Sequence, residues 1–167
     1  MSAEIAVLRV VDSAAMESLG TAVGQQLRRS DVVGLSGPLG AGKTTFTRGL
    51  AIGLGVREAV ASPTFVIARR SAGEIADLLH CDAYRLGSPD EFLDLDLDTH
   101  SAVTVIEWGQ EVVPLLSDSW LALTIDRGQG QGDDDRWVHI AAVGPDWDGA
   151  RVQALLAAVG FAVVGLP

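Results

Sequence analysis

Cysteine is nearly absent from this chain of 167 residues. The single cysteine, Cys81, excludes an internal disulfide and a zinc site built from several cysteines, and we expect a reducing, cytoplasmic environment. The start of the chain lacks a basic segment followed by a long apolar run, so we predict no signal peptide. The length is typical of one domain, here residues 1–167, which can bury a core without disulfides or a structural metal.

Positive charge is also scarce. The chain has 12 Lys and Arg residues against 22 Asp and Glu residues, which gives a net charge of -10. Proteins that bind nucleic acid normally carry a basic face, so we expect no direct binding to tRNA or other nucleic acid. Arginines that are distant in the sequence could still cluster in space.

Long apolar runs are missing as well. The one long uncharged stretch, residues 152–167, is shorter than a membrane span and contains Gln153, Gly160 and Pro167. We interpret it as a buried C-terminal helix and tail, with a docking surface for a partner as the alternative. No membrane association is expected.

Hydrophobic periodicity predicts alternating strands and helices over the first half of the chain, and mainly strands later. The predicted strands cover residues 5–11, 31–36, 65–70, 74–81, 103–106, 121–125 and 137–143. The predicted helices cover residues 13–29, capped by Ser13, 43–54, ended by Gly55, 88–95 and 147–159. The pattern indicates an α/β protein with a mixed sheet and helices on its faces.

The clearest motif lies between the strand at residues 31–36 and the helix that follows. Residues 37–44 read GPLGAGKT and match G-x-x-x-x-G-K-[ST], the phosphate-binding P-loop. Its glycines let several backbone N–H groups point at phosphate oxygens, and the helix N-terminus adds a favourable dipole. An idle glycine-rich turn is the alternative. The residues that we expect to contact the phosphates or their magnesium ion are Gly37, Gly40, Ala41, Gly42, Lys43, Thr44 and Thr45.

Lysine and asparagine decide which nucleotide is expected. Lys43 is the only lysine, and every other Lys/Arg position is arginine, which indicates that a compact ammonium is required there. Reading guanine through an N-K-x-D motif is impossible, because the chain has no asparagine and its one lysine lies in the loop. We therefore predict ATP, bound with Mg²⁺.

Two carboxylates follow predicted apolar strands. P-loop proteins carry at this position an acidic residue that lies near the magnesium ion or the attacking water. Glu107 follows VTVI and Asp82 follows LLHC. Each could instead cap a turn. Trp108 comes next to Glu107, and core packing is the simpler interpretation of its role, with shielding of the site as the alternative.

The sequence Ser62-Pro63-Thr64 lies where P-loop switch proteins keep a loop that responds to the γ-phosphate. The Thr64 hydroxyl could approach magnesium or that phosphate, although an ordinary proline turn is the alternative. The three histidines, His80, His100 and His139, show no metal-ligand spacing.

Four segments together resemble the TsaE family, formerly YjeE: LSGPLGAGKTTFTRGLAIGLGV, SPTFVI, HCDAYRL and VTVIEW. The resemblance covers roughly residues 12–143. It implies a P-loop NTPase-like three-layer fold with a mixed, mostly parallel sheet and helices on both faces. It also implies magnesium-dependent ATP hydrolysis that drives the complex forming threonylcarbamoyladenosine beside the tRNA anticodon, with TsaB-like and TsaD-like proteins as partners.

The resemblance also assigns roles to particular residues. It implies that Lys43 and Thr44 contact phosphate and magnesium, and that Glu107 is a second magnesium ligand. The other residues that it brings to the site are Thr64, Asp82, Trp108, Ser13 and Arg136, the last two as nucleotide contacts. The competing hypotheses are a small P-loop kinase acting on a metabolite and a non-catalytic nucleotide switch. A kinase usually needs a lid and several arginines, which the sequence does not show.

Overall fold

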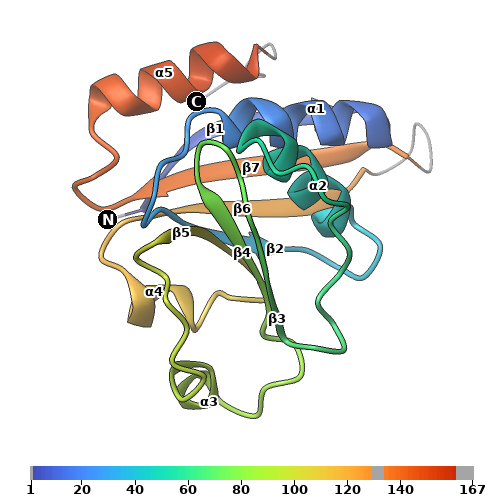
Figure 1. The fold of residues 1–167 in the computed structure, drawn as a ribbon. Helices are drawn as coiled ribbons and strands as arrows, with labels where there is room; N and C mark the ends of the chain where they lie inside the picture. Colours follow the sequence, from blue (N-terminus) through green and yellow to red (C-terminus); the bar gives the residue numbers. More distant parts are fainter. Residues whose placement is uncertain (1, 129–133, 161–167) are drawn as a thin grey trace.

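The computed structural model describes residues 2–128 and 134–160, which form seven strands and five helices (Figure 1). The strands are β1 (Ser2–Val10), β2 (Val32–Ser36), β3 (Ala68–Ser71), β4 (Asp77–Asp82), β5 (Ala102–Glu107), β6 (Trp120–Arg127) and β7 (Arg136–Val143). The helices are α1 (Ser13–Gly24), α2 (Lys43–Gly53), α3 (Pro89–Leu93), α4 (Val113–Leu116) and α5 (Gly149–Val159). Within these ranges, no helix combines the length and the apolar character needed to cross a membrane.

The strands form one sheet in the order β1-β7-β6-β2-β5-β4-β3. The four central strands, β6, β2, β5 and β4, run parallel to one another. The outer strands β1, β7 and β3 pair antiparallel with their neighbours. The predicted mixed sheet is confirmed, and the carboxyl ends of its parallel strands share one edge, where ligands bind in open α/β sheets.

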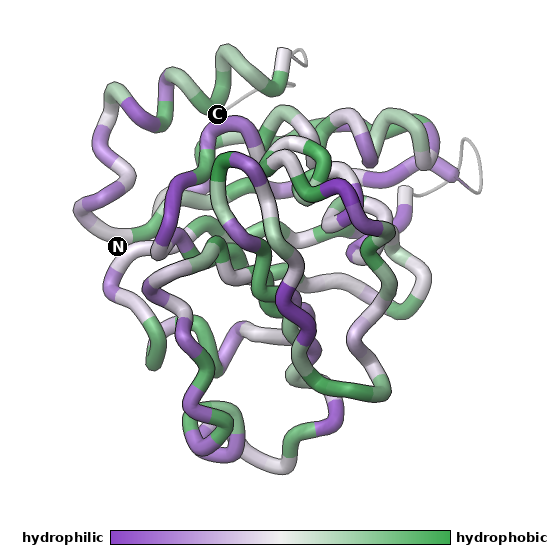
Figure 2. Tube along the Cα trace, in the orientation of Figure 1, coloured by the Kyte–Doolittle hydropathy of each residue, from purple (hydrophilic) through white to green (hydrophobic). Residues whose placement is uncertain are grey.

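Helices cover both faces of the sheet (Figure 1). Along β2, Val33 and Leu35 pack in the larger core cluster with α1, α2 and α5, whereas Val32 packs in a smaller cluster with α3 and α4. This alternation follows from the pleat, which points successive side chains to opposite faces. Figure 2 shows hydrophobic residues recurring along the strands and along the helices that cover them. The chain therefore forms three layers.

Helix α2, which begins at the predicted phosphate loop, packs unusually close to α1 through glycines of both helices. A Cβ atom added at Gly20 would lie 2.1 Å from the carbonyl oxygen of Phe46, and one added at Gly49 would lie 1.9 Å from that of Glu17. Gly24 and Gly53 lie four residues further along each helix and make similar approaches. Because the helices touch backbone to backbone, α1 fixes the position of α2 and of the loop before it.

Several predicted boundaries were wrong for local reasons. The cap of α1 is Asp12, whose side chain accepts the N–H of Ala15 at 2.7 Å, so Ser13 is the first helical residue and not the cap. The helix ends at Gly24 and not near residue 29, because Asp31 closes a turn by accepting the N–H of Arg28 at 2.7 Å. Asp148 caps α5, which begins two residues later than predicted.

The region around β3 differs more. The strand begins at Ala68 and not at residue 65, and a loop of residues 72–76 replaces the predicted tight hairpin. Gly73 in that loop forms a bridge with Val56, which follows α2. The short helix α4 was not predicted. The C-terminal helix is confirmed with Leu155 and Val159 buried, while the predicted tail at residues 161–167 lies outside the described residues.

Candidate nucleotide site

The loop of residues 37–42 connects β2 to α2, where the sequence predicted it. Gly37, Gly40 and Gly42 have φ angles of 148°, 76° and 112°. Only glycine adopts such angles readily. Gly37 meets a second restriction, since a Cβ there would lie 2.4 Å from the carbonyl oxygen of Ile125. The loop shape therefore depends on its glycines.

Two arginines hold the loop from the side of β6 and β7. Arg127 Nη2 donates to the carbonyl oxygen of Leu39 at 2.8 Å, and Arg136 Nε donates to that of Ala41 at 3.0 Å. Arg136 was predicted as a nucleotide contact, and in the structure its guanidinium bonds to the backbone of the loop. Both arginines therefore fix the directions of loop carbonyl groups.

Lys43 is the first residue of α2, and its side chain folds back over the loop. Its Nζ donates to the carbonyl oxygens of the first two loop residues, at 2.8 and 3.0 Å, and lies 4.3 Å from the centre of the Trp108 ring. The residue is only 5% exposed. Burial lowers the pKa of Lys43, and the negative charges of Glu107 and Asp82 act in the opposite direction.

The two predicted carboxylates are the last residues of adjacent parallel strands, where Asp82 and Glu107 are register partners. Both are buried. Glu107 Oε1 accepts the hydroxyl of Thr44 at 3.3 Å, whereas Asp82 Oδ2 accepts the hydroxyl of Thr64 at 3.0 Å. The backbone N–H of Tyr84 bonds Asp82 Oδ1 at 2.9 Å. Glu107 is thus linked to α2, and Asp82 is linked to the loop of residues 62–64.

Thr64 lies between two oxygen atoms. Its Oγ1 is 2.6 Å from Ser62 Oγ, in addition to its bond with Asp82. The loop predicted to respond to the γ-phosphate is therefore connected to the end of β4 by hydrogen bonds between the side chains of Ser62, Thr64 and Asp82.

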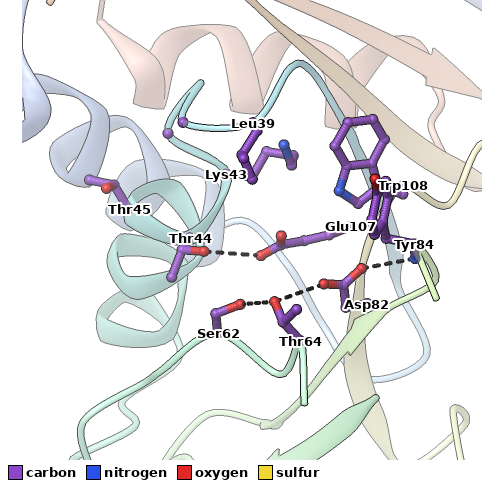
Figure 3. Close-up of a pocket in the computed structure, with 12 residues that line it drawn as sticks. Leu39, Lys43, Thr44, Thr45, Ser62, Thr64, Asp82, Tyr84, Glu107 and Trp108 are labelled. Carbon is purple, nitrogen blue, oxygen red and sulfur yellow. Dashed lines mark hydrogen bonds between the residues drawn. The ribbon is translucent and has the colours of Figure 1, made fainter. Parts of the chain in front are cut away.

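These groups surround a pocket of about 400 Å³ (Figure 3). Its lining residues come from the loop of residues 37–42, the start of α2, the loop of residues 62–64, and the ends of β4 and β5 with the residues just after them: Leu39, Gly40, Gly42, Lys43, Thr44, Thr45, Ser62, Thr64, Asp82, Tyr84, Glu107 and Trp108. Trp108 has a positive φ of 59° and stacks at a tilt on Tyr84, with 5.2 Å between ring centres. Core packing was therefore the wrong interpretation of Trp108, since its ring forms a wall of this pocket.

A smaller pocket of about 130 Å³ lies on the other side of the same loop. Ser13 and Arg136, distant in the sequence, both line it. Gly40, Gly42 and Thr45 line both pockets, so the loop and the start of α2 separate them. The structure thus groups the predicted site residues around one loop, and all of them except Gly37 line at least one of these two pockets.

The donor set fits a magnesium ion bound together with phosphate. The described ranges contain no group of three or more His, Cys, Asp and Glu side chains that could hold a metal by themselves. Mg²⁺ usually binds through one or two protein oxygens, with water and substrate phosphate completing the shell. Thr44 Oγ1 and Glu107 Oε1 are hard oxygen donors 3.3 Å apart, as such a site requires.

Sequence reasoning missed His80, which lacked metal-ligand spacing. Its Nε2 lies 2.9 Å from Glu107 Oε1, and both side chains are buried. A signal was available, because His80 precedes Asp82 by two residues in one strand and so shares its face. His80 could therefore have been recognised as a site residue from its position in the strand relative to Asp82, although its spacing is not that of a metal ligand.

The fold and this loop define an α/β protein of the P-loop NTPase-like class. The model of the family described as "Threonylcarbamoyl adenosine biosynthesis protein TsaE" matches residues 10–136, and the chain belongs to this family.

Curated relatives and a solved structure agree with that assignment. The tRNA threonylcarbamoyladenosine biosynthesis protein TsaE of Streptomyces coelicolor is 51% identical over 146 residues, which cover 84% of this chain and 99% of that protein. The protein of the same name from Bacillus subtilis is 42% identical over 115 residues, covering 68% and 71%. The crystal structure of Bacillus subtilis YdiB aligns with a TM-score of 0.72 and 29% identity over 96% of each chain. The predicted family and fold class are confirmed.

Proposed function

We propose that this protein binds ATP with magnesium beside the loop of residues 37–44, hydrolyses it, and so drives turnover of the complex that forms threonylcarbamoyladenosine beside the tRNA anticodon. One observation carries the proposal: Lys43 and Thr44, at the start of α2, and Glu107, at the end of β5, converge on one pocket of about 400 Å³. Membership of the TsaE family supports the role in tRNA modification.

Phosphate binding would use the loop and the start of α2. Backbone N–H groups and the helix dipole favour negative charge there, and the Lys43 ammonium lies over the loop. The nucleoside end of ATP would extend toward the smaller pocket, where Ser13 and Arg136 would contact it. Thr45, which lines both pockets, would lie beside the bound nucleotide.

Hydrolysis would use the two carboxylates differently. Thr44 and Glu107 would hold magnesium, which when bound would neutralise charge on the transferred phosphoryl group. Asp82 and Thr64, hydrogen-bonded at 3.0 Å at the same pocket, would orient the attacking water. Lys43 would stabilise the charge that develops as the bond to the leaving ADP breaks.

Contact with tRNA would pass through TsaD-like and TsaB-like partner proteins. The net charge of -10 disfavours direct binding to a polyanion. ATP hydrolysis would then act on the conformation of the partners, and the ATPase rate would be low for the protein alone and higher with them.

The test uses ATP labelled in the γ-phosphate, magnesium, and the protein with and without its partners. The proposal predicts free labelled phosphate, released faster when the partners are present. Label transferred to a small metabolite would instead identify a kinase. Nucleotide binding without any turnover would identify a non-catalytic switch and contradict the proposed hydrolysis.

A further inference from the structure

His80 is a buried histidine of β4 with no part in the chemistry proposed above. It lies opposite Val105 in the pairing of β4 with β5, so Glu107 is two residues further along β5 and on the same face. His80 Nε2 is 2.9 Å from Glu107 Oε1, and the two side chains are 2% and 6% exposed. The contact joins adjacent strands at the edge that carries the pocket.

The surroundings of the imidazole decide which nitrogen carries its proton. Among the residues that the structure describes, His80 Nδ1 is buried and has no hydrogen-bond partner. A carboxylate oxygen only accepts hydrogen bonds, so we assign the proton to Nε2, which donates to Glu107. This assignment leaves only an acceptor unpaired at Nδ1, and a buried unpaired acceptor is tolerated more readily than an unpaired donor.

Glu107 is consequently held at one of its two oxygens. Oε1 accepts from His80 at 2.9 Å and from Thr44 at 3.3 Å, while Oε2 accepts no hydrogen bond from the described residues. Figure 3 shows the second oxygen of Glu107 turned away from the bond to Thr44, and Glu107 lines the pocket. The shorter contact comes from a side chain fixed in the sheet, which restricts the flexible glutamate.

We propose that His80 is a positioning residue: its Nε2–H fixes the Glu107 carboxylate in the orientation that holds magnesium with the nucleotide. This inference rests on the proposed function and adds a specific supporting contact. Removing the donor would leave a buried carboxylate with one bond fewer and free to rotate. Loss of such a supporting group around a metal ligand typically lowers metal affinity or activity by about 10- to 100-fold.

Three variants separate this role from simple packing. His80→Leu removes the donor, and His80→Gln keeps an N–H donor at the end of a side chain of similar reach. His139→Leu is the matched control, since His139 also bonds a glutamate, Glu4, at 2.9 Å, but lies on β7. Each variant is assayed for phosphate release from ATP with the partner proteins and for thermal unfolding. The magnesium concentration that half-saturates its ADP complex is followed by intrinsic tryptophan fluorescence.

We expect His80→Leu to lower kcat by about 10- to 100-fold and to raise the half-saturating magnesium concentration by a similar factor. The affinity for ADP in the presence of EDTA should not change. His80→Gln should recover most of both losses, and His139→Leu should match the wild type. If His80→Leu fails to fold, His80→Asn replaces it, because its amide nitrogen corresponds to Nδ1 and does not reach Glu107.

Wild-type kcat and magnesium dependence in the variant without a donor would overturn the proposal. The proposal would also be overturned if His80→Leu and His80→Gln lost kcat and magnesium affinity equally and in proportion to their loss of thermal stability. Packing of the side chain would then explain both losses. A wild-type protein that releases no phosphate would instead overturn the proposed ATPase function. The magnesium titration of the ADP complex would then still test His80.

Discussion

Replacing Gly49 by alanine tests the backbone contact that positions α2 and, with it, Lys43 and Thr44. The added Cβ would lie 1.9 Å from the carbonyl oxygen of Glu17, where real Cβ contacts essentially never fall below 3.0 Å. Alanine favours a helix by up to about 1 kcal/mol over glycine, whereas overpacking costs about 1–3 kcal/mol. The obstacle is backbone, which no rotamer change can relieve, so the upper end applies and the net loss is about 2 kcal/mol.

For a protein of this size, that loss lowers Tm by roughly 4–8 °C. Gly149→Ala is the matched control, because a Cβ on this residue at the start of α5 would meet nothing within 4 Å. The assay is thermal unfolding followed by circular dichroism, at equal protein concentration and without nucleotide. If Gly49→Ala melts at or above the temperature of Gly149→Ala, α1 and α2 do not pack backbone to backbone.

Three further predictions concern single side chains. Glu107→Ala should lower the rate of ATP hydrolysis by about 10-fold or more while changing ATP affinity much less, because magnesium stabilises charge that develops in the transition state; equal losses in affinity and turnover would refute its assigned role. Thr64→Ala should remove the difference in affinity for the partner complex between the ATP and ADP states, measured by equilibrium binding, and a preserved difference would exclude Thr64 as the sensor. Burial, aided by the charge of Asp82, raises the pKa of the Cys81 thiol to about 12, so at pH 8 iodoacetamide should alkylate it only as fast as the protein unfolds. Rapid labelling of the folded protein would contradict the burial of this thiol. Because the folded state disfavours the thiolate, the free energy of unfolding should also fall as the pH rises above the ordinary pKa of a thiol toward 12.

Features that depend on local chemistry were predictable from the sequence. The glycines of the motif predict a loop with positive φ angles, which the structure shows. The motif also predicts that Lys43 lies at the start of the helix that follows the loop. The ends of β4 and β5 were also predictable, because an apolar run followed by a carboxylate marks the carboxyl end of a parallel strand. The pairing of Asp82 with Glu107 was not predicted, because it depends on the adjacency of the two strands in the sheet.

Features that depend on contacts between distant segments were not predictable. Arg127 reaches the loop across 88 positions of sequence, and no local pattern marks such a contact. The early end of α1 depends on a turn closed by Asp31, which also pairs with Arg151 of α5. The residue type of Trp108 suggests core packing, whereas in the structure the residue has a positive φ and its ring lies against the Lys43 ammonium. Tertiary contacts therefore decided these details of the site.

The central claim is that ATP hydrolysis at the loop of residues 37–44 drives the tRNA modification, and Lys43→Ala tests it most directly. Phosphate release and repeated formation of threonylcarbamoyladenosine are measured together, in one reaction with the partner proteins, tRNA, ATP and magnesium. Lys43 would contribute charge-assisted hydrogen bonds worth about 1.5–3 kcal/mol each, so its loss should lower phosphate release at least about 10-fold. Repeated formation of threonylcarbamoyladenosine should fall in parallel. Two results would contradict this claim: unchanged phosphate release in Lys43→Ala, or tRNA modification that continues at the wild-type rate although phosphate release is lost.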